Sequence, residues 1–117
     1  MSEIAQREFW RRFYAALDAG DAETASALFP DGTEIYLWDG RTFHTREEFE
    51  AWFRELYSKS ENARREITSF TVTGDIAEIR VVLRATIDGE KRTVSLNHVT
   101  HFEGDQLVRV EVSIFPL

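Results

Sequence analysis

The chain contains no cysteine in its 117 residues. It can therefore form neither a disulfide nor a thiolate metal site, and it has no cysteine nucleophile. It also lacks any apolar run near the ~20 residues that span a membrane, and the segment after Met1 is polar and amphipathic rather than a signal peptide. We therefore expect a soluble protein that stays in the cytoplasm of the cell that expresses it.

Positive charge is scarce. Fourteen Lys and Arg stand against 21 Asp and Glu, the net charge is −7, and no basic cluster with interleaved aromatics occurs, which argues against nucleic acid as a partner. The three histidines do not share a face at ligand spacing, so no metal site is expected. The nine Phe, three Trp and three Tyr suit either a core or the wall of an apolar pocket. Length and composition predict one globular domain over residues 1–117.

Three helices are expected in the first half. Residues 2–19 form the first, with Ser2 as N-cap and Gly20 after its last turn, and Asp21 caps a short second one. A Thr45–Glu48 capping box opens the third, whose apolar face precedes a polar exit loop over residues 58–63.

The remaining segments alternate as strands. A hairpin of residues 34–38 and 41–44 is predicted around a two-residue type I′ turn at Asp39-Gly40. Four longer strands follow, joined by Gly-Asp or Asp-Gly pairs: residues 64–73, 76–87, 90–102 and 106–115. Helices followed by an antiparallel meander indicate the α+β class.

His98 is the first polar residue on an apolar strand face. It shares that face with Val94, Leu96, Thr100 and Phe102. A two-residue loop at 88–89 pairs Ile79 with His98. A three-residue loop Glu103–Asp105, with a bulge at Gly104, pairs His98 with Val110 and Leu96 with Val112. A buried imidazole of this kind needs a partner.

Three further polar residues are predicted to point inward. Tyr14 and Asp18 lie along the edge of the apolar stripe of the first helix. Ile67 and Phe70 are three residues apart, which breaks the alternation of their strand, and a bulge near Thr68-Ser69 restores it. The same bulge turns Arg65 toward the interior, where it needs an anion, and Asp18 is the candidate.

Two pairs follow, Tyr14 with His98 and Asp18 with Arg65. Each residue also has an ordinary structural explanation: a satisfied core histidine, an amphipathic tyrosine, a solvated aspartate, a snorkelling arginine. Together they could bind an anionic substrate oxygen and move one proton. We expect His44 and His101 on the surface, and the polar outer face of the sheet predicts a monomer.

The order of elements resembles the NTF2-like fold, a cone in which three helices pack on a highly curved antiparallel sheet that encloses an apolar pocket. Natural proteins of this layout include ketosteroid isomerases, scytalone dehydratases and small-molecule cyclases. The chain is more similar still to computationally designed luciferases built on idealised NTF2-like scaffolds. The segments that carry this resemblance are residues 11–14, 16–18, 37–40, 46–49 and 64–67, together with His98.

The luciferase resemblance implies a cofactor-free oxidation by O₂, with light emission, of a synthetic imidazopyrazinone luciferin such as diphenylterazine. It places Tyr14 and His98 at the luciferin's carbonyl oxygen and Asp18 and Arg65 at its heterocycle, where they stabilise the anion that reacts with oxygen. Related designs can carry an arginine at the position of Ser60, and this chain lacks that charge. The substrate-binding residues expected are Leu37, Phe49, Ser60, Leu83, Leu96, Val110 and Val112.

Two other functions stay open. One is an NTF2-like isomerase or dehydratase in which Asp18 or His98 is the base and Tyr14 stabilises an enolate. The other is a scaffold that binds a small molecule without catalysis.

Overall fold

The computed structural model describes residues 2–104 and 106–116 and contains three helices and six strands. The helices are α1 (Glu3–Asp18), α2 (Ala22–Ala27) and α3 (Arg46–Lys59). The strands are β1 (Glu34–Leu37), β2 (Thr42–Phe43), β3 (Ser60–Thr73), β4 (Ile76–Ile87), β5 (Glu90–Glu103) and β6 (Gln106–Pro116). No helix in these ranges is both long and apolar enough to cross a membrane.

The helix starts are those that the capping residues predict. The Ser2 hydroxyl accepts a hydrogen bond from the Ala5 N–H at 3.1 Å, and Thr45 and Glu48 form the reciprocal capping box of α3. Gly20 takes the left-handed conformation after α1, with φ +74°. The predicted exit loop over residues 58–63 is wrong, because α3 continues to Lys59 and β3 begins at Ser60. The residues at the start of this edge strand are polar and at least partly exposed, so their sequence resembles that of a loop.

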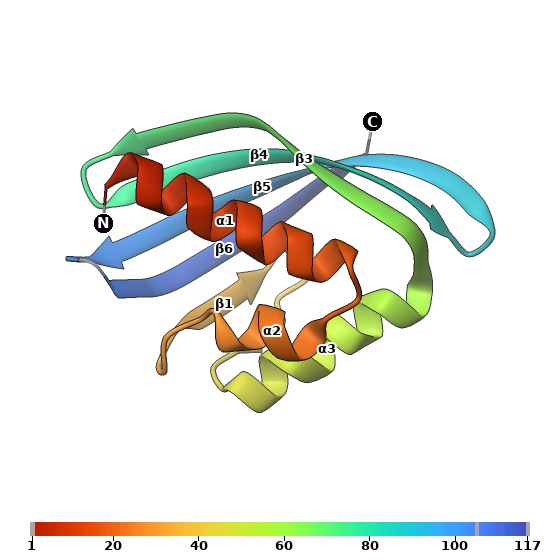
Figure 1. Ribbon diagram of the computed structural model, residues 1–117, viewed down its shortest axis with the longest axis horizontal. Coiled ribbons are helices and arrows are strands. Elements are labelled where there is room, and N and C mark those ends of the chain that lie inside the picture. Colours follow the sequence, from red (N-terminus) through yellow and green to blue (C-terminus); the bar gives the residue numbers. More distant parts are fainter. Residues whose placement is uncertain (1, 105, 117) are drawn as a thin grey trace.

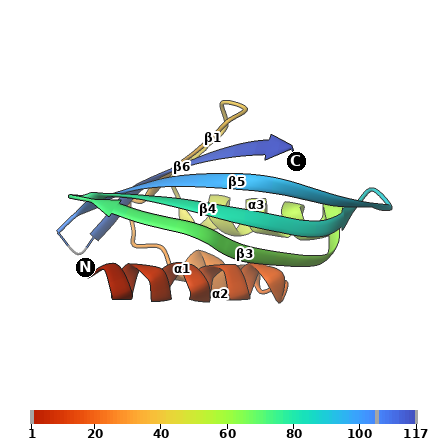
Figure 2. The same cartoon turned by 90° about the horizontal axis from the view of Figure 1, so that it is seen from above.

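The sheet has the order β2-β1-β6-β5-β4-β3. The predicted meander is confirmed, since β3 through β6 pair antiparallel in chain order. The hairpin joins the edge of β6, where β1 runs parallel to that strand. Figure 1 shows α1 lying across the strands with α2 and α3 below it, and Figure 2 shows the strands from β3 to β6 as one bent layer.

Strand β3, at the edge of the sheet opposite β2, contains two irregularities. The pairs Ile67 with Val81 and Ser69 with Arg80 leave Thr68 as an extra residue, which confirms the predicted bulge. A second register shift lies between Glu61 and Arg64, with Asn62 at φ +53°. That shift was not predicted.

Two predicted turns are wrong. Leu37 N–H donates to the Arg41 carbonyl at 2.9 Å, so the β1–β2 loop has the three residues 38–40, and Gly40 alone takes a left-handed φ. This geometry is a type I turn followed by a left-handed residue rather than a type I′ turn. At the other hairpin Glu103 pairs with Gln106, which excludes the predicted three-residue loop; Asp105 lies outside the described residues.

The β5–β6 register therefore differs from the prediction, whereas the β4–β5 register agrees with it. Ile79 pairs with His98 as expected. On the other side His98 pairs with Val112 rather than Val110, and Leu96 pairs with Ile114 rather than Val112. The pairing shifts between His101 and Phe102, so the extra residue is Val108, within β6 rather than in the turn. Val110 and Val112 still face inward.

An aromatic cluster packs one end of the space between helices and sheet. Trp10 and Phe13 from α1 meet edge to face at 5.5 Å between ring centroids, and Phe29 lies 5.0 Å from Phe13. Phe53 from α3 closes the cluster, 5.5 Å from Phe13. These four aromatic side chains also border a cavity between the helices and the sheet.

Candidate functional site

A cavity of about 230 Å³ lies between α1, α3 and the inner face of the sheet. Most of its wall is apolar. The wall also includes a phenol, an imidazole and a guanidinium, from Tyr14, His98 and Arg65, and Lys59 and Ser60 contribute at the junction of α3 and β3. An apolar cavity with a few convergent polar groups is the usual form of a small-molecule site.

Tyr14 and His98 form the predicted pair. The Tyr14 hydroxyl lies 3.1 Å from His98 Nδ1, and both residues are buried. The imidazole packs against Trp10, with 5.8 Å between ring centroids. Position 14 lies on the buried stripe of α1, and position 98 on the inner face of β5. The pattern that places these two residues in contact is therefore the ordinary amphipathic pattern of each element.

Both members of this pair are uncharged at neutral pH. Burial, helped by the positive charge of Arg65, lowers the pKa of His98 to about 3. Burial raises the pKa of the Tyr14 hydroxyl, and the same arginine only partly opposes the rise. If the hydroxyl donates to Nδ1, a neutral ring keeps its proton on Nε2; if Nδ1–H donates, the hydroxyl proton is left over. In each case one donor remains for a ligand.

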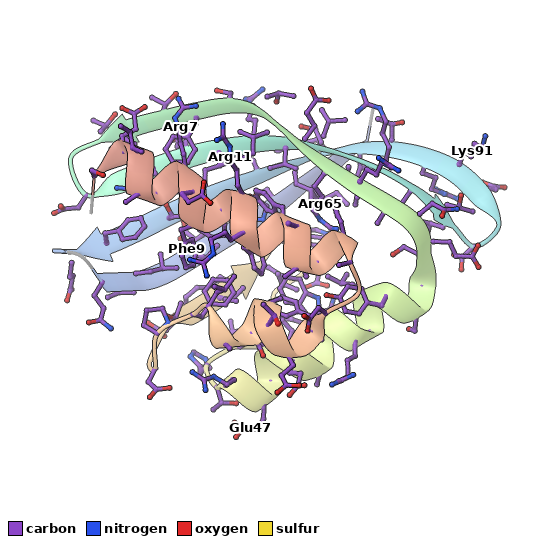
Figure 3. The ribbon with its side chains drawn as sticks, viewed as in Figure 1. Arg7, Phe9, Arg11, Glu47, Arg65 and Lys91 are labelled. Atoms are coloured by element: carbon purple, nitrogen blue, oxygen red, sulfur yellow. The ribbon has the colours of Figure 1, made fainter. Side chains whose placement is uncertain are left out.

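Asp18 and Arg65 form the second predicted pair. The guanidinium Nη1 lies 2.5 Å from Asp18 Oδ1, and the Arg65 backbone N–H donates to Oδ2 at 2.9 Å. Figure 3 shows Arg65 beside the C-terminal end of α1. The Arg65 side chain is only 6% exposed and lines the cavity, whereas Asp18 is 24% exposed and does not line it. Asp18 therefore holds Arg65 in place from the side away from the cavity. This corrects the expectation that Asp18 and Arg65 both contact the ligand.

The Trp10 indole is a polar group that the sequence did not single out. Trp10 is fully buried and lines the cavity, and no acceptor within residues 2–104 and 106–116 lies in hydrogen-bonding range of its Nε1–H. An unpaired buried donor is uncommon in folded proteins. The Trp10 Nε1–H is therefore a further donor that an acceptor atom of a ligand could pair with.

Five of the seven predicted substrate-binding residues line the cavity: Ser60, Leu83, Leu96, Val110 and Val112. The other two do not. Leu37 is buried on β1, where it pairs with Val112, and Phe49 packs against Phe29 at 5.5 Å between ring centroids. Both are inward apolar residues, and an apolar pattern does not distinguish a packed position from one beside a cavity.

Several lining residues were missed. They come from all parts of the chain: Trp10, Phe13, Leu17, Phe29, Ile35, Trp38, Trp52, Phe53, Leu56, Lys59, Ile87, Val94 and Ile114. For most of them the sequence contains only the ordinary core pattern. Trp38 is different, because a tryptophan beside Asp39-Gly40 places a large apolar ring in a turn.

The other two histidines lie outside the cavity. His44 Nδ1 is 3.3 Å from Glu34, and His101 Nε2 is 3.6 Å from Glu111, each with a partly exposed side chain, as predicted for surface residues. Within the part of the chain that the structure describes, no three His, Asp or Glu side chains gather as a metal site would require.

The cavity is suited to hold a negatively charged or strongly polarised oxygen. Arg65 supplies a fixed positive charge, and the Tyr14–His98 pair supplies a hydrogen-bond donor, both within an apolar wall. Such groups act strongly where water is excluded.

Solved structures with the same fold share little sequence with the chain. A Catenulispora acidiphila protein of ketosteroid isomerase-like fold, solved with trimethylamine, is 20% identical with a TM-score of 0.79, over 90% of this chain and 83% of that one. An NTF2-like protein of unknown function from Burkholderia pseudomallei is 22% identical with a TM-score of 0.79, over 96% and 90%. An M. tuberculosis LEH-like epoxide hydrolase is 11% identical with a TM-score of 0.72, over 92% and 80%.

These likenesses confirm the predicted NTF2-like fold. No curated protein matches the chain in sequence. The SnoaL-like domain family matches residues 10–110, a range that includes Tyr14, Asp18, Arg65 and His98. The chain therefore belongs to the SnoaL-like domain family.

Proposed function

We propose that the chain is a luciferase that oxidises an imidazopyrazinone such as diphenylterazine with O₂ and emits light, without a metal or organic cofactor. The observation that carries the proposal is the combination, in one apolar cavity, of the Arg65 cation with the neutral Tyr14–His98 pair. The resemblance to designed luciferases supports the choice of substrate, and it is carried by residues 11–14, 16–18, 37–40, 46–49 and 64–67 together with His98.

The chemistry asked of these residues is stabilisation of an anion. An imidazopyrazinone reacts with oxygen as its deprotonated form, whose negative charge is shared between its oxygen and the ring system. Arg65 favours that form by charge, and the free donor of the Tyr14–His98 pair binds the oxygen. Asp18 binds the guanidinium through Oδ1 and accepts from the Arg65 backbone N–H through Oδ2, which keeps Arg65 in place.

Proton abstraction, as in an isomerase or dehydratase, is less well supported. A base whose pKa is about 3 removes protons poorly at neutral pH, which weakens the case for His98. Asp18 is bound to Arg65 and does not line the cavity. His98 thus lines the cavity but is too weakly basic, and Asp18 does not reach the cavity.

The test is light emission from purified protein with diphenylterazine, in air, under nitrogen, and with a chelator. We expect emission that needs O₂ and is unaffected by the chelator. Arg65→Met should reduce it by at least about tenfold, because the anion loses its countercharge. Arg84→Met is the matched control, since Arg84 is an exposed β4 arginine outside the cavity. Absence of light, or equal loss in both variants, would contradict the proposal.

A further inference from the structure

Trp38 lies at the mouth of the cavity. It follows β1 in the three-residue turn, lines the cavity, and is nevertheless 50% exposed. Lys59, which also lines the cavity, is exposed, and Ser60 and Ile87 are partly exposed and paired with each other. The mouth is therefore open to solvent, with one large aromatic ring on its rim.

A network of polar contacts fixes this turn relative to α3. Gly40 N–H donates to the Leu37 carbonyl at 3.1 Å, and Arg41 Nε lies 2.8 Å from the Asp39 carboxylate. The same guanidinium reaches Glu55 of α3, 3.5 Å away. The turn that carries Trp38 is thus tied to α3 through Arg41.

The size of the cavity makes an external contact necessary for a long ligand. Pockets that enclose drug-sized molecules usually have volumes of at least about 300 Å³, and this one has about 230 Å³. The Tyr14–His98 pair is buried, so a ligand whose oxygen binds there starts deep in the cavity. The far end of a multi-ring molecule must then pass through the mouth.

We propose that Trp38 forms an aromatic subsite at the mouth of the cavity, which binds the distal ring of an elongated ligand whose oxygen binds at Tyr14 and His98. The ligand class is an aromatic molecule with one phenolic or carbonyl oxygen at one end and a flat apolar ring at the other. This inference shares one assumption with the proposed function, namely that the oxygen of the ligand binds at Tyr14 and His98. Arg41 is a positioning residue for the subsite.

The test uses ligands of increasing length rather than a luciferin. Phenol, 4-phenylphenol and 4-hydroxy-p-terphenyl carry the same hydroxyl and one, two or three rings in line. Their dissociation constants are measured by calorimetry, at one low concentration of dimethyl sulfoxide, for the unchanged chain and for Trp38→Ala. Phe115→Ala is the matched control, because Phe115 is 53% exposed, pairs with Ser95, and does not line the cavity.

Trp38→Ala should weaken binding of the three-ring phenol by about threefold to tenfold, the range expected for one aromatic contact. Its effect on phenol should stay below about twofold, because phenol ends inside the cavity. Phe115→Ala should change neither constant. An equal effect of Trp38→Ala on all three ligands, no effect on the longest, or no binding by any of them would overturn the proposal.

Arg41→Gln tests whether Arg41 affects ligand binding only by positioning Trp38. It should also weaken the three-ring ligand, but should have no further effect once Trp38 is alanine, since its action passes through that ring. Loss of affinity that adds in the double variant would contradict the positioning role. Light emission is not used in these measurements, so a failed luciferase assay with an intact length dependence would refute the proposed reaction and leave the subsite supported.

Discussion

The Asp18 carboxylate binds Arg65 at two points, its backbone N–H and its guanidinium. One contact fixes the path of β3 beside the end of α1, and the other fixes the charge that lines the cavity. A cation near the C-terminus of a helix is also favourable to the helix dipole, which Asp18 alone opposes. The ion pair therefore joins the fold to the electrostatics of the site.

Asp18→Ala should lower the free energy of unfolding by about 2–3 kcal/mol, because it leaves a nearly buried guanidinium without its anion; the lower end allows for the partial exposure of Asp18. Urea unfolding followed by circular dichroism measures the change. Glu8→Ala, at an exposed position on the same helix, is the control and should be close to neutral. Equal stability of the two variants would show that the pair contributes little to folding.

Tyr14→Phe should reduce light emission by about tenfold, because the pair that binds the luciferin oxygen loses its hydroxyl. Unfolding should also become easier by about 1 kcal/mol, since His98 Nδ1 loses its partner. Tyr57→Phe is the matched control: its hydroxyl makes only a 3.5 Å contact with the Ala16 carbonyl and does not line the cavity. The role of Tyr14 would be refuted by emission that is the same in both variants.

Stability should fall as the pH is lowered from about 7 to about 5, in part because of His98. An unfolded histidine titrates near pH 6.5, whereas the pKa of the folded His98 is about 3. Between these values the unfolded state binds one more proton, so the contribution of His98 to the free energy of unfolding decreases by up to about 1.4 kcal/mol per pH unit. Urea unfolding of the unchanged chain and of His98→Leu at several pH values measures this contribution. If the free energies of unfolding of the two proteins depend on pH in the same way, the lowered pKa of His98 is contradicted.

Trp10→Phe should change the free energy of unfolding by no more than about 1 kcal/mol. The smaller ring loses packing, but an indole N–H without an acceptor is removed, and the two effects oppose one another. Trp10→Ala should instead cost about 3–5 kcal/mol, since it opens a large void next to His98. Thermal or urea unfolding distinguishes these outcomes. A loss for phenylalanine as large as for alanine would mean that the N–H is satisfied.

Much of the site could be predicted because it depends on local patterns. The broken alternation between Ile67 and Phe70 revealed the Thr68 bulge, and the bulge in turn predicted an inward Arg65. The helical spacing of Tyr14 and Asp18 then placed both partners on the right side of α1. The Tyr14–His98 and Asp18–Arg65 contacts could therefore be predicted from the spacing of residues along the chain.

The β5–β6 register could not be obtained in this way. The predicted and observed pairings of His98, with Val110 or with Val112, differ by two residues, and a period of two cannot distinguish them. The parallel pairing of β1 with β6 has no local indication either, since it joins segments more than 70 residues apart. For the same reason the apolar pattern could not show that Leu37 and Phe49 are packed while Ile35 and Phe53 border the cavity.

The extra residue at Thr68 means that the length of β3 decides whether Arg65 faces the cavity. Without it, the part of β3 before the bulge would turn over, presenting Arg64 and Glu66 to the interior and Arg65 to solvent. A one-residue insertion or deletion would therefore exchange several inward side chains at once. Variants of altered length in β3 can reach combinations of cavity side chains that no single substitution produces.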